Sequence, residues 1–411
     1  MSDSKKDTLS ARIEALNERI QTAKKNDLYP YMRCSDAVEG VHITVQGRPM
    51  LQFASYSYLD LLGHPKINAA AKKAIDDFGT GTHGVRFLTG TIQIHSELEK
   101  KIAAFKRTED ALAIASGYGA NFGTISALLG RNDAVISDKI NHASIVDGCI
   151  LSRAQFVRFE HNDMEALDKA LGESSKKGTR LVVTDAVFSM DGDIVNLPEM
   201  IKLCRKHKAL LMIDEAHSLG VLGKKGHGIE EHFGLDPKDT PIDIRMGTLS
   251  KTIPSVGGYL AGNSKLINFL RHSIRPFIFS AALPPSAAAA AKAAFEVIED
   301  EPWRVEKLHK NTDYFLKTLQ ARGFDTLNSQ TSIVPIIIGE EQKALEMTRL
   351  AKNEGIFIVP ILPPAVPPNT TRIRATVTAG HSLQEIDRAI NVFEKIATSL
   401  DILSPWKKGK A

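Results

Sequence analysis

Residues 209–218 read ALLMIDEAHS and contain five consecutive apolar residues that end at Asp214. An apolar run of this length, bounded by polar residues, predicts a strand that is buried on both faces of a parallel sheet. Ligands of α/β proteins bind beyond the carboxyl ends of such strands, which is where Asp214 and His217 fall. The stretch therefore predicts an α/β fold with a ligand site at these side chains.

Short apolar runs alternate with helical stretches over about residues 65–290. This alternation predicts βαβ units and a large, doubly wound, mostly parallel sheet. The runs are 111–115, 134–137, 155–159, 181–184, 210–213 and 244–246.

The two ends of the chain have other patterns. Leu9, Ile13, Leu16 and Ile20 predict an amphipathic helix, and a pair of strands is expected at 41–45 and 50–53. The expected C-terminal elements, which predict a smaller α+β domain, are strands at 332–338 and 372–377 and helices at 343–353 and 383–400.

We expect three parts: an N-terminal segment (1–60), a large domain (61–290) and a small domain (291–411). A length of 411 residues exceeds what one ordinary core supports, in keeping with this division. The alanine-rich run at 287–294 is expected to be a helix that connects the domains.

Composition excludes several classes of protein. A net charge of +4 over this length is too small to indicate a nucleic-acid-binding protein. No stretch approaches the roughly 18 apolar residues that a membrane span requires. Residues 1–7 are polar and lack the apolar centre of a signal peptide, and 407–410 are expected to be a solvated end. The three cysteines are far apart and form no metal motif. We expect a cytoplasmic protein without a metal site.

Residues 246–262, MGTLSKTIPSVGGYLAG, place Lys251 beside the hydroxyls of Thr248 and Ser250 and before Gly257 and Gly258. A lone lysine is usually a surface residue. Here the hydroxyls and glycines suit a phosphate, and the amine suits a carbonyl cofactor, so the stretch indicates a Schiff base with pyridoxal 5'-phosphate (PLP).

Asp214 and His217 fit that cofactor. A carboxylate at the strand end can keep the pyridine nitrogen protonated, which makes the ring an electron sink. His217 could reach the phenolic oxygen of the ring. In the alternative interpretation, Asp214 only caps a following helix.

Two other motifs resemble sequence signatures of different functions. The letters DEAH at 214–217 also resemble the acidic box of P-loop ATPases, but such enzymes need G-x-x-x-x-G-K-[ST], and no G-K-S or G-K-T occurs in the chain. GTGTHG at 79–84 matches a dinucleotide fingerprint, yet it follows the helical stretch 67–75 instead of a strand. We interpret it as a glycine-rich active-site loop.

The course from Tyr58 to about His381 resembles the α-oxoamine synthase family of fold-type I PLP-dependent enzymes. The motifs that carry the resemblance are YL at 58–59, HP at 64–65, NHAS at 141–144, FSMDGD at 188–193, DEAHS at 214–218, GTLSK at 247–251, SVGGY at 255–259 and RIR at 372–374. Members of this family condense an amino acid with an acyl thioester and release carbon dioxide and the free thiol, which gives an α-amino ketone.

The resemblance implies roles around the ring. Lys251 would hold PLP and later move the Cα proton, Asp214 would pair with the pyridinium nitrogen, and His217 would pair with the phenolate oxygen. His142 would stack on the ring, although a helix-start histidine bonded to backbone is the plain alternative. Ser189 would lie on the side of the ring oxygen.

A phosphate site is expected where SGYGAN (116–121) joins a strand to a helix. Gly117 and Tyr118 would donate backbone amides, and Thr248 and Ser250 would donate hydroxyls. The resemblance adds the hydroxyl of Ser280 from the other subunit, so it implies a homodimer with a shared active site.

Arg374 is the expected ligand of the substrate carboxylate, because a guanidinium offers two parallel hydrogen bonds and the family places its substrate arginine there. Arg372 shares a face with Arg374 and is expected to form a surface salt bridge. Ser57 stands where many members have an asparagine that helps to hold the substrate.

Val85 is similar to the residue found at this position in members of the family that use glycine. This similarity favours a small amino acid, namely glycine, alanine or serine, as the substrate. The acyl donor is expected to be acyl-CoA or an acyl carrier protein. Two alternatives remain open: a fold-type I aminotransferase, and a non-catalytic relative that serves as a partner subunit.

Overall fold

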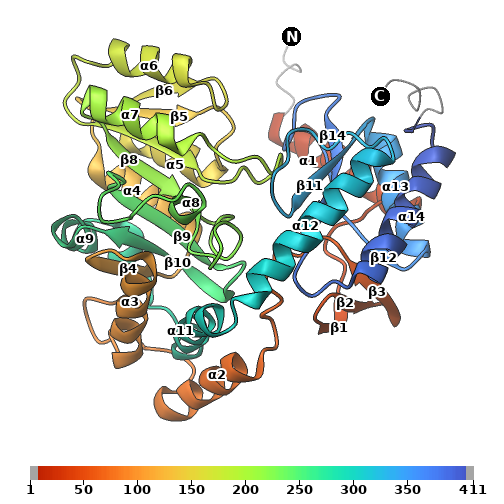
Figure 1. The fold of residues 1–411 in the computed structure, drawn as a ribbon, viewed down its shortest axis with the longest axis horizontal. Helices are drawn as coiled ribbons and strands as arrows, with labels where there is room; N and C mark the ends of the chain where they lie inside the picture. The colour runs from red at the N-terminus through yellow and green to blue at the C-terminus, as the bar shows by residue number, and fades with distance from the viewer. Residues whose placement is uncertain (1–7, 404–411) are drawn as a thin grey trace, which may run out of the picture.

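A seven-stranded sheet forms the centre of the larger part of the molecule, on the left of Figure 1. The computed structural model describes residues 8–403. The strands, in spatial order, are β4 (Asp110–Ile114), β10 (Pro254–Gly262), β9 (Ile244–Ser250), β8 (Leu210–Asp214), β7 (Arg180–Asp185), β5 (Ala134–Asp138) and β6 (Gln155–Phe159).

All six strands expected from residues 65–290 are present, and the pairs from β9 through β6 are parallel. The unexpected strand is β10, which is antiparallel to both of its neighbours, β4 and β9. The sheet is therefore mostly parallel, as predicted, but carries one strand that the sequence pattern did not indicate.

Helices cover both faces of this sheet, which explains the uninterrupted apolar runs. Leu211 and Ile213 of β8 belong to one buried cluster, while Met212 between them belongs to a second cluster on the opposite face. The helices of this part are α2 (Pro65–Phe78), α3 (Gln93–Lys106), α4 (Gly117–Leu128), α5 (Ala143–Ser152), α6 (Met164–Glu173), α7 (Leu197–His207), α8 (Ile229–His232), α9 (Ser264–Arg271), α10 (Arg275–Ile278) and α11 (Pro285–Asp300).

The smaller part lies on the right of Figure 1 and contains two sheets. One has the order β11–β14–β13 and the other the order β1–β2–β3–β12. The strands are β1 (Ser35–Glu39), β2 (His42–Val45), β3 (Arg48–Gln52), β11 (Ile333–Gly339), β12 (Ile356–Phe357), β13 (Pro360–Ile361) and β14 (Thr371–Thr376). The helices are α1 (Thr8–Lys25), α12 (Trp303–Ala321), α13 (Glu341–Asn353) and α14 (Leu383–Ser399).

The N-terminal strands are built into this smaller part. Leu51 of β3 pairs in parallel with Ile356 of β12. Phe53 is fully buried in the same cluster as Phe315 and Phe393, and its ring centroid lies 5.6 Å from that of Phe315. The N-terminal segment and the C-terminal region therefore share one hydrophobic core.

The alanine-rich run is a helix, as expected, but it does not connect the domains. Helix α11 packs against α2 and α3, and its buried residues belong to the core of the large sheet. Along α12, Val305 and Leu308 belong to that core, whereas Phe315, Leu316 and Leu319 belong to the second core, so the helix passes from one core to the other, and it spans the two parts in Figure 1. The division into residues 1–60, 61–290 and 291–411 stays a proposal.

Within residues 8–403, no helix combines the length and the apolar character needed to cross a bilayer. The expectations for residues 1–7 and 407–410 fall outside the described residues.

Candidate active site

The carboxyl ends of β7, β8 and β9 lie side by side at a cavity of about 240 Å³. Asp185, the last residue of β7, is in register with Asp214, the last residue of β8. The lining residues are Ser116, Gly117, Tyr118, Asn121, His142, Ser144, Asp185, Ser189, Asp214, Ala216, His217, Met246, Thr248, Ser250 and Lys251. Nine residues predicted from the sequence are thus brought together at one place.

Lys251 is partly buried in this cavity, and its Nζ lies 2.7 Å from Nε2 of His217. Burial lowers the pKa of Lys251 from its usual 10.5 to about 8, against the opposing charges of Asp214 and Asp185. A substantial fraction of the amine is therefore neutral near physiological pH, which is the form that attacks a carbonyl carbon. The surface-lysine interpretation is wrong for this residue.

His217 is held from its other side by a residue for which the sequence suggested no role. Its Nδ1 lies 2.7 Å from the hydroxyl of Tyr58, which is fully buried. Burial lowers the pKa of His217 well below its usual 6.5, and the positive charge of Lys251 acts in the same direction. The imidazole is therefore neutral and can exchange hydrogen bonds with both partners.

Asp214 is only 3% exposed and is oriented by amide groups. Its Oδ2 accepts a hydrogen bond of 2.7 Å from Nδ2 of Asn121, and its Oδ1 accepts one of 2.8 Å from the backbone N–H of Ala216. Asp214 has no ion-pair partner among residues 8–403. A buried carboxylate without a cation is costly, so this environment suits a cationic ring nitrogen.

His142 starts a helix and also lines the cavity, so its helix-start role is seen, whereas its stacking on the cofactor ring stays a prediction. It precedes α5, where its Nδ1 accepts a hydrogen bond of 3.3 Å from the backbone N–H of Ser144. Its own backbone N–H donates to Oδ2 of Asp185 at 2.8 Å. Burial, reinforced by the charge of Asp214, raises the pKa of Asp185 well above its usual value.

The start of α4 and the β9–β10 pair form a cradle around Gly117. A Cβ on Gly258 would lie 2.6 Å from Cα of Gly117, and a Cβ on Gly117 would lie 2.9 Å from Oγ1 of Thr248. The hydroxyls of Thr248 and Ser250 are 2.8 Å apart. Free amides at a helix start together with hydroxyls suit a phosphate, so the residues present fit PLP at the phosphate, the ring and the amine.

Arg374 lies on β14, in the smaller part of the molecule, and contacts the cavity-lining Ser189 without lining the cavity itself. Its Nε donates to the carbonyl oxygen of Ser189 at 2.5 Å, and its Nη1 donates to Oγ1 of Thr376 at 3.2 Å. In the described part of the chain, no carboxylate pairs with Arg374. Its charge also lowers the pKa of Lys251. A guanidinium with no acidic partner close to the reactive amine is suited to a substrate carboxylate.

Ser57 has a buried Oγ without a hydrogen-bond partner in the described residues. An unsatisfied buried hydroxyl is uncommon in folded proteins. Ser57 does not line the active-site cavity, so its expected contact with the substrate stays a prediction.

Two expectations from the sequence need correction. Arg372 is not at the surface: it is 4% exposed and pairs with Asp191. The loop at 79–84 does not line the cavity of its own chain; Val85 forms a β-bridge with Ala281, and the backbone N–H of Ala282 donates to the carbonyl oxygen of Gly84. Ser280 is exposed and lies outside the cavity of its own chain, so its expected role in the site of a second subunit stays a prediction.

Four residues at or next to the cavity were not indicated as site residues by the sequence: Tyr58, Asn121, Ser144 and Asp185. Asp185 ends an apolar strand, as Asp214 does, and that signal would have found it. Asn121 lies one turn into α4, so its position facing Asp214 depends on how the helix meets the strand. No pattern in the sequence reveals that contact.

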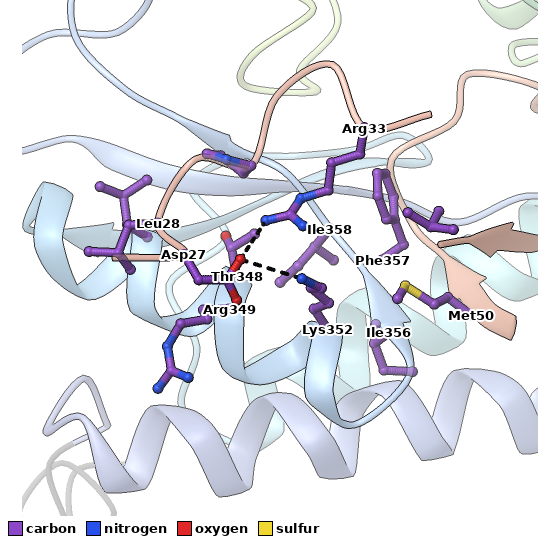
Figure 2. Close-up of a pocket in the computed structure, with 13 residues that line it drawn as sticks. Asp27, Leu28, Arg33, Met50, Thr348, Arg349, Lys352, Ile356, Phe357 and Ile358 are labelled. Atoms are coloured by element: carbon purple, nitrogen blue, oxygen red, sulfur yellow. Dashed lines mark hydrogen bonds and ion pairs between the residues drawn. The ribbon is translucent and has the colours of Figure 1, made fainter. Parts of the chain in front are cut away.

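Figure 2 shows a second cavity, between the N-terminal segment and α13. Asp27 is bonded there to Arg33 and Lys352, at 3.4 and 3.5 Å. The volume of about 20 Å³ has room for little more than a water molecule. This cavity is therefore too small for a cofactor or an amino acid.

Residues 48–393 match the family model of aminotransferase class I and II. The 8-amino-7-oxononanoate synthase of Thermoanaerobacter pseudethanolicus is 44% identical, over 95% of this chain and 98% of that protein. The serine palmitoyltransferase of Bacteroides ovatus is 42% identical, over 92% of this chain and 95% of that protein. The chain belongs to this family, and within it to the α-oxoamine synthases.

Solved structures agree with this assignment. A serine palmitoyltransferase from S. paucimobilis with bound PLP superposes with a TM-score of 0.92 at 33% identity, over 97% of this chain and 100% of that chain. The predicted fold-type I architecture is therefore confirmed, as are PLP as the cofactor and an enzymatic role.

Proposed function

We propose that this enzyme condenses a small amino acid with an acyl thioester, releasing carbon dioxide and the free thiol and giving an α-amino ketone. The observation that carries the proposal is the Lys251 amine, whose lowered pKa places it in a partly neutral form beside His217 and Asp214. The relatives named above are synthases and acyltransferases, so the aminotransferase alternative is not favoured. The ATPase alternative is not favoured, because the chain has no G-K-S or G-K-T, and Glu215 is buried in an ion pair with Lys106.

PLP, when bound, supplies an electron sink for bonds that break at the amino-acid Cα. The residues of the chain supply the rest. Lys251 can accept a proton from Cα and return it, because its amine changes charge near physiological pH. Asp214 would keep a cationic ring nitrogen charged, and the flat ring of His142 would exclude water from one side of the pocket.

Arg374 and Ser57 are proposed to bind the amino acid. The guanidinium of Arg374 has no carboxylate partner in residues 8–403, and the Oγ of Ser57 has no hydrogen-bond partner there. They offer a bidentate site for the carboxylate and one further hydrogen bond. Glycine, alanine and serine are the proposed substrates, and acyl-CoA or an acyl carrier protein is the proposed donor.

The proposed partner is a second copy of this chain, which would complete the phosphate site with Ser280. Large apolar side chains are exposed on the same two segments as Val85 and Ala281: Phe87 is 46% exposed, Leu88 78% and Phe279 70%. Exposed apolar clusters of this kind mark protein–protein contacts. A cytoplasmic location, proposed from the sequence, agrees with the three cysteines, which are all unpaired.

A matrix of amino acids against acyl thioesters of graded chain length tests the reaction. Free thiol and product mass are measured for each pair, with Lys251→Ala as the inactive control. The expected product is an α-amino ketone formed with one equivalent of thiol. Accumulation of keto acids without thiol release would instead identify an aminotransferase.

Arg374→Gln tests the carboxylate site. Loss of a charge-assisted bidentate contact is worth about 1.5–3 kcal/mol, so the KM for the amino acid is expected to rise by about 10- to 100-fold. The KM for the acyl thioester should stay nearly constant. Arg349→Gln on α13, where Arg349 pairs with Glu346, is the control and should change neither constant.

A further inference from the structure

The segment 186–195 folds into a hairpin directly after β7. Val187 forms a β-bridge with Ile194, and Phe188 and Asp193 are joined by a backbone hydrogen bond of 3.1 Å. The chain reverses at Gly192, which has a φ of +74°. This 186–195 hairpin carries Ser189 on its first arm, in the active-site cavity.

The second arm of the hairpin is held by His161, which no part of the proposed reaction uses. Nε2 of His161 donates to Oδ2 of Asp193 at 2.9 Å, and Nδ1 donates to the carboxylate of Asp138 at 3.1 Å. Both ring nitrogens therefore donate, which requires the charged imidazolium. Burial opposes that charge, but hydrogen bonds to Asp138 and Asp193 outweigh it and raise the pKa of His161 to about 10.

His161, Asp191 and Asp193 lie close enough together to suggest a metal site. Their contacts argue against one. Both nitrogens of His161 already donate to carboxylates, and Asp191 is paired with Arg372. The positive charges of His161 and Arg372 therefore already neutralise the carboxylates that a metal ion would need as ligands.

The tip of the hairpin is held by the small domain. The carbonyl oxygen of Gly192 accepts hydrogen bonds of 3.0 Å from the backbone N–H of Gln330 and from Oγ1 of Thr331. Arg372 of β14 donates to the carbonyl oxygen of Met190 at 3.2 Å. The hairpin is thus fixed at its second arm by the large domain and at its tip by the small domain.

The first arm then acts on the substrate arginine, because the carbonyl oxygen of Ser189 accepts the hydrogen bond from Nε of Arg374. We propose that His161 and Asp193 are positioning residues: they fix the 186–195 hairpin so that Ser189 holds Arg374 toward the amino-acid carboxylate. This inference rests on the proposed role of Arg374. His161 lies outside the cavity, yet the inference gives it an effect on the binding of the amino acid and none on that of the thioester.

The test is His161→Gln in the holoenzyme, with Asp193→Asn as a second variant of nearly unchanged shape. The KM for the amino acid is expected to rise about tenfold, while kcat and the KM for the thioester stay within about twofold. Absorbance titration of the bound cofactor with the amino acid should show the same loss of affinity. His207→Gln is the matched control, because His207 is also partly buried and its Nε2 lies 2.6 Å from Asp168; it should change none of these values.

A double-mutant cycle separates positioning from a general loss of structure. If His161 acts through Arg374, then His161→Gln in the Arg374→Gln background should raise the amino-acid KM by less than about twofold. An equal rise in both backgrounds, or an equal rise in the KM of both substrates, overturns the inference. If His161→Gln does not fold, as judged by thermal unfolding, Asp193→Asn decides by the same criteria.

The two proposals fail in different ways. An unchanged amino-acid KM in Arg374→Gln overturns the proposed role of Arg374 and this inference with it. If Arg374→Gln raises the amino-acid KM strongly but His161→Gln and Asp193→Asn leave it unchanged, only the inference about His161 is overturned.

Discussion

Two opposing influences, burial and nearby carboxylates, set the pKa of the Lys251 amine. Burial disfavours the ammonium form, whereas the carboxylates of Asp214 and Asp185 favour it. The balance is a pKa of about 8, which keeps the neutral and the charged amine both populated near neutral pH. The two proposed roles of Lys251, attack on a carbonyl carbon and later transfer of a proton, need both forms.

This pKa predicts how cofactor capture depends on pH. In cofactor-free protein, the rate of PLP trapping by borohydride at Lys251 should rise with a midpoint near pH 8, because only the neutral amine reacts. A midpoint near 10.5 would contradict the buried environment. Asp214→Asn removes the largest of the charges that favour the ammonium form, so its midpoint should be lower, and Lys251→Ala should show no trapping.

The same shift affects stability with a definite sign. The pKa of Lys251 is lower in the folded protein than its usual 10.5, so burial of the charged amine costs free energy below about pH 8. That cost disappears as the pH rises from about 8 to 10.5. Through this residue, the cofactor-free protein gains stability over that window.

Single site residues were predictable from sequence where they follow a strand. Asp214 ends β8, and Ser250 ends β9 just before Lys251, so both positions follow from apolar runs. Asn121 and Tyr58 reach the site through the packing of a helix and of the N-terminal segment, and such contacts between distant parts of the chain leave no local pattern.

The junction of β10 with the start of α4 allows a test of the phosphate cradle. Gly258→Ala would place a methyl group 2.6 Å from Cα of Gly117, and overpacking of this kind costs about 1–3 kcal/mol. We expect a lower unfolding temperature and weaker PLP binding, measured by thermal unfolding and by fluorescence titration.

Gly172→Ala in α6 is the matched control, because no other heavy atom lies within 4 Å of the added methyl group. Its expected effect is a gain of at most about 1 kcal/mol, from the better helix propensity of alanine. Equal PLP affinity in the two variants would show that the cradle tolerates a side chain and would contradict the assignment of this junction to the phosphate.

Strand β10 shows why some elements escape prediction. Residues 254–262 contain three glycines and one proline, which are poor strand formers. The strand exists because both of its edges are paired, with β4 and β9. The parallel strands, by contrast, are rich in β-branched and apolar residues, so their own composition indicates them.

For the molecule as a whole, the proposed shared active site predicts complementation between two inactive variants. Lys251→Ala lacks the reactive amine, and Ser280→Tyr would block the phosphate site of the neighbouring subunit. In a mixed dimer, one site has Lys251 from one chain and Ser280 from the other, so unfolding and refolding the two variants together should restore thiol release.

Each variant refolded alone is the control for this experiment and should stay inactive. A Ser280→Tyr protein with full activity would contradict the contribution of Ser280, and a monomer in sedimentation would contradict the dimer. Failure of the mixture, with both variants dimeric, would show that each active site is built from one chain.

Leu51 and Ile356 are neighbours in one sheet, although the whole of the large domain separates them along the chain. The ribosome therefore releases the complete seven-stranded sheet before it has made the partner for β3. We expect Phe53 to stay exposed until its core neighbours, Phe315 to Phe393, have also been made, and until then to be an apolar target for chaperones near the amino terminus. Chains that end early through a nonsense codon would keep this target permanently, which makes them substrates for proteolytic quality control even where the PLP pocket has already formed.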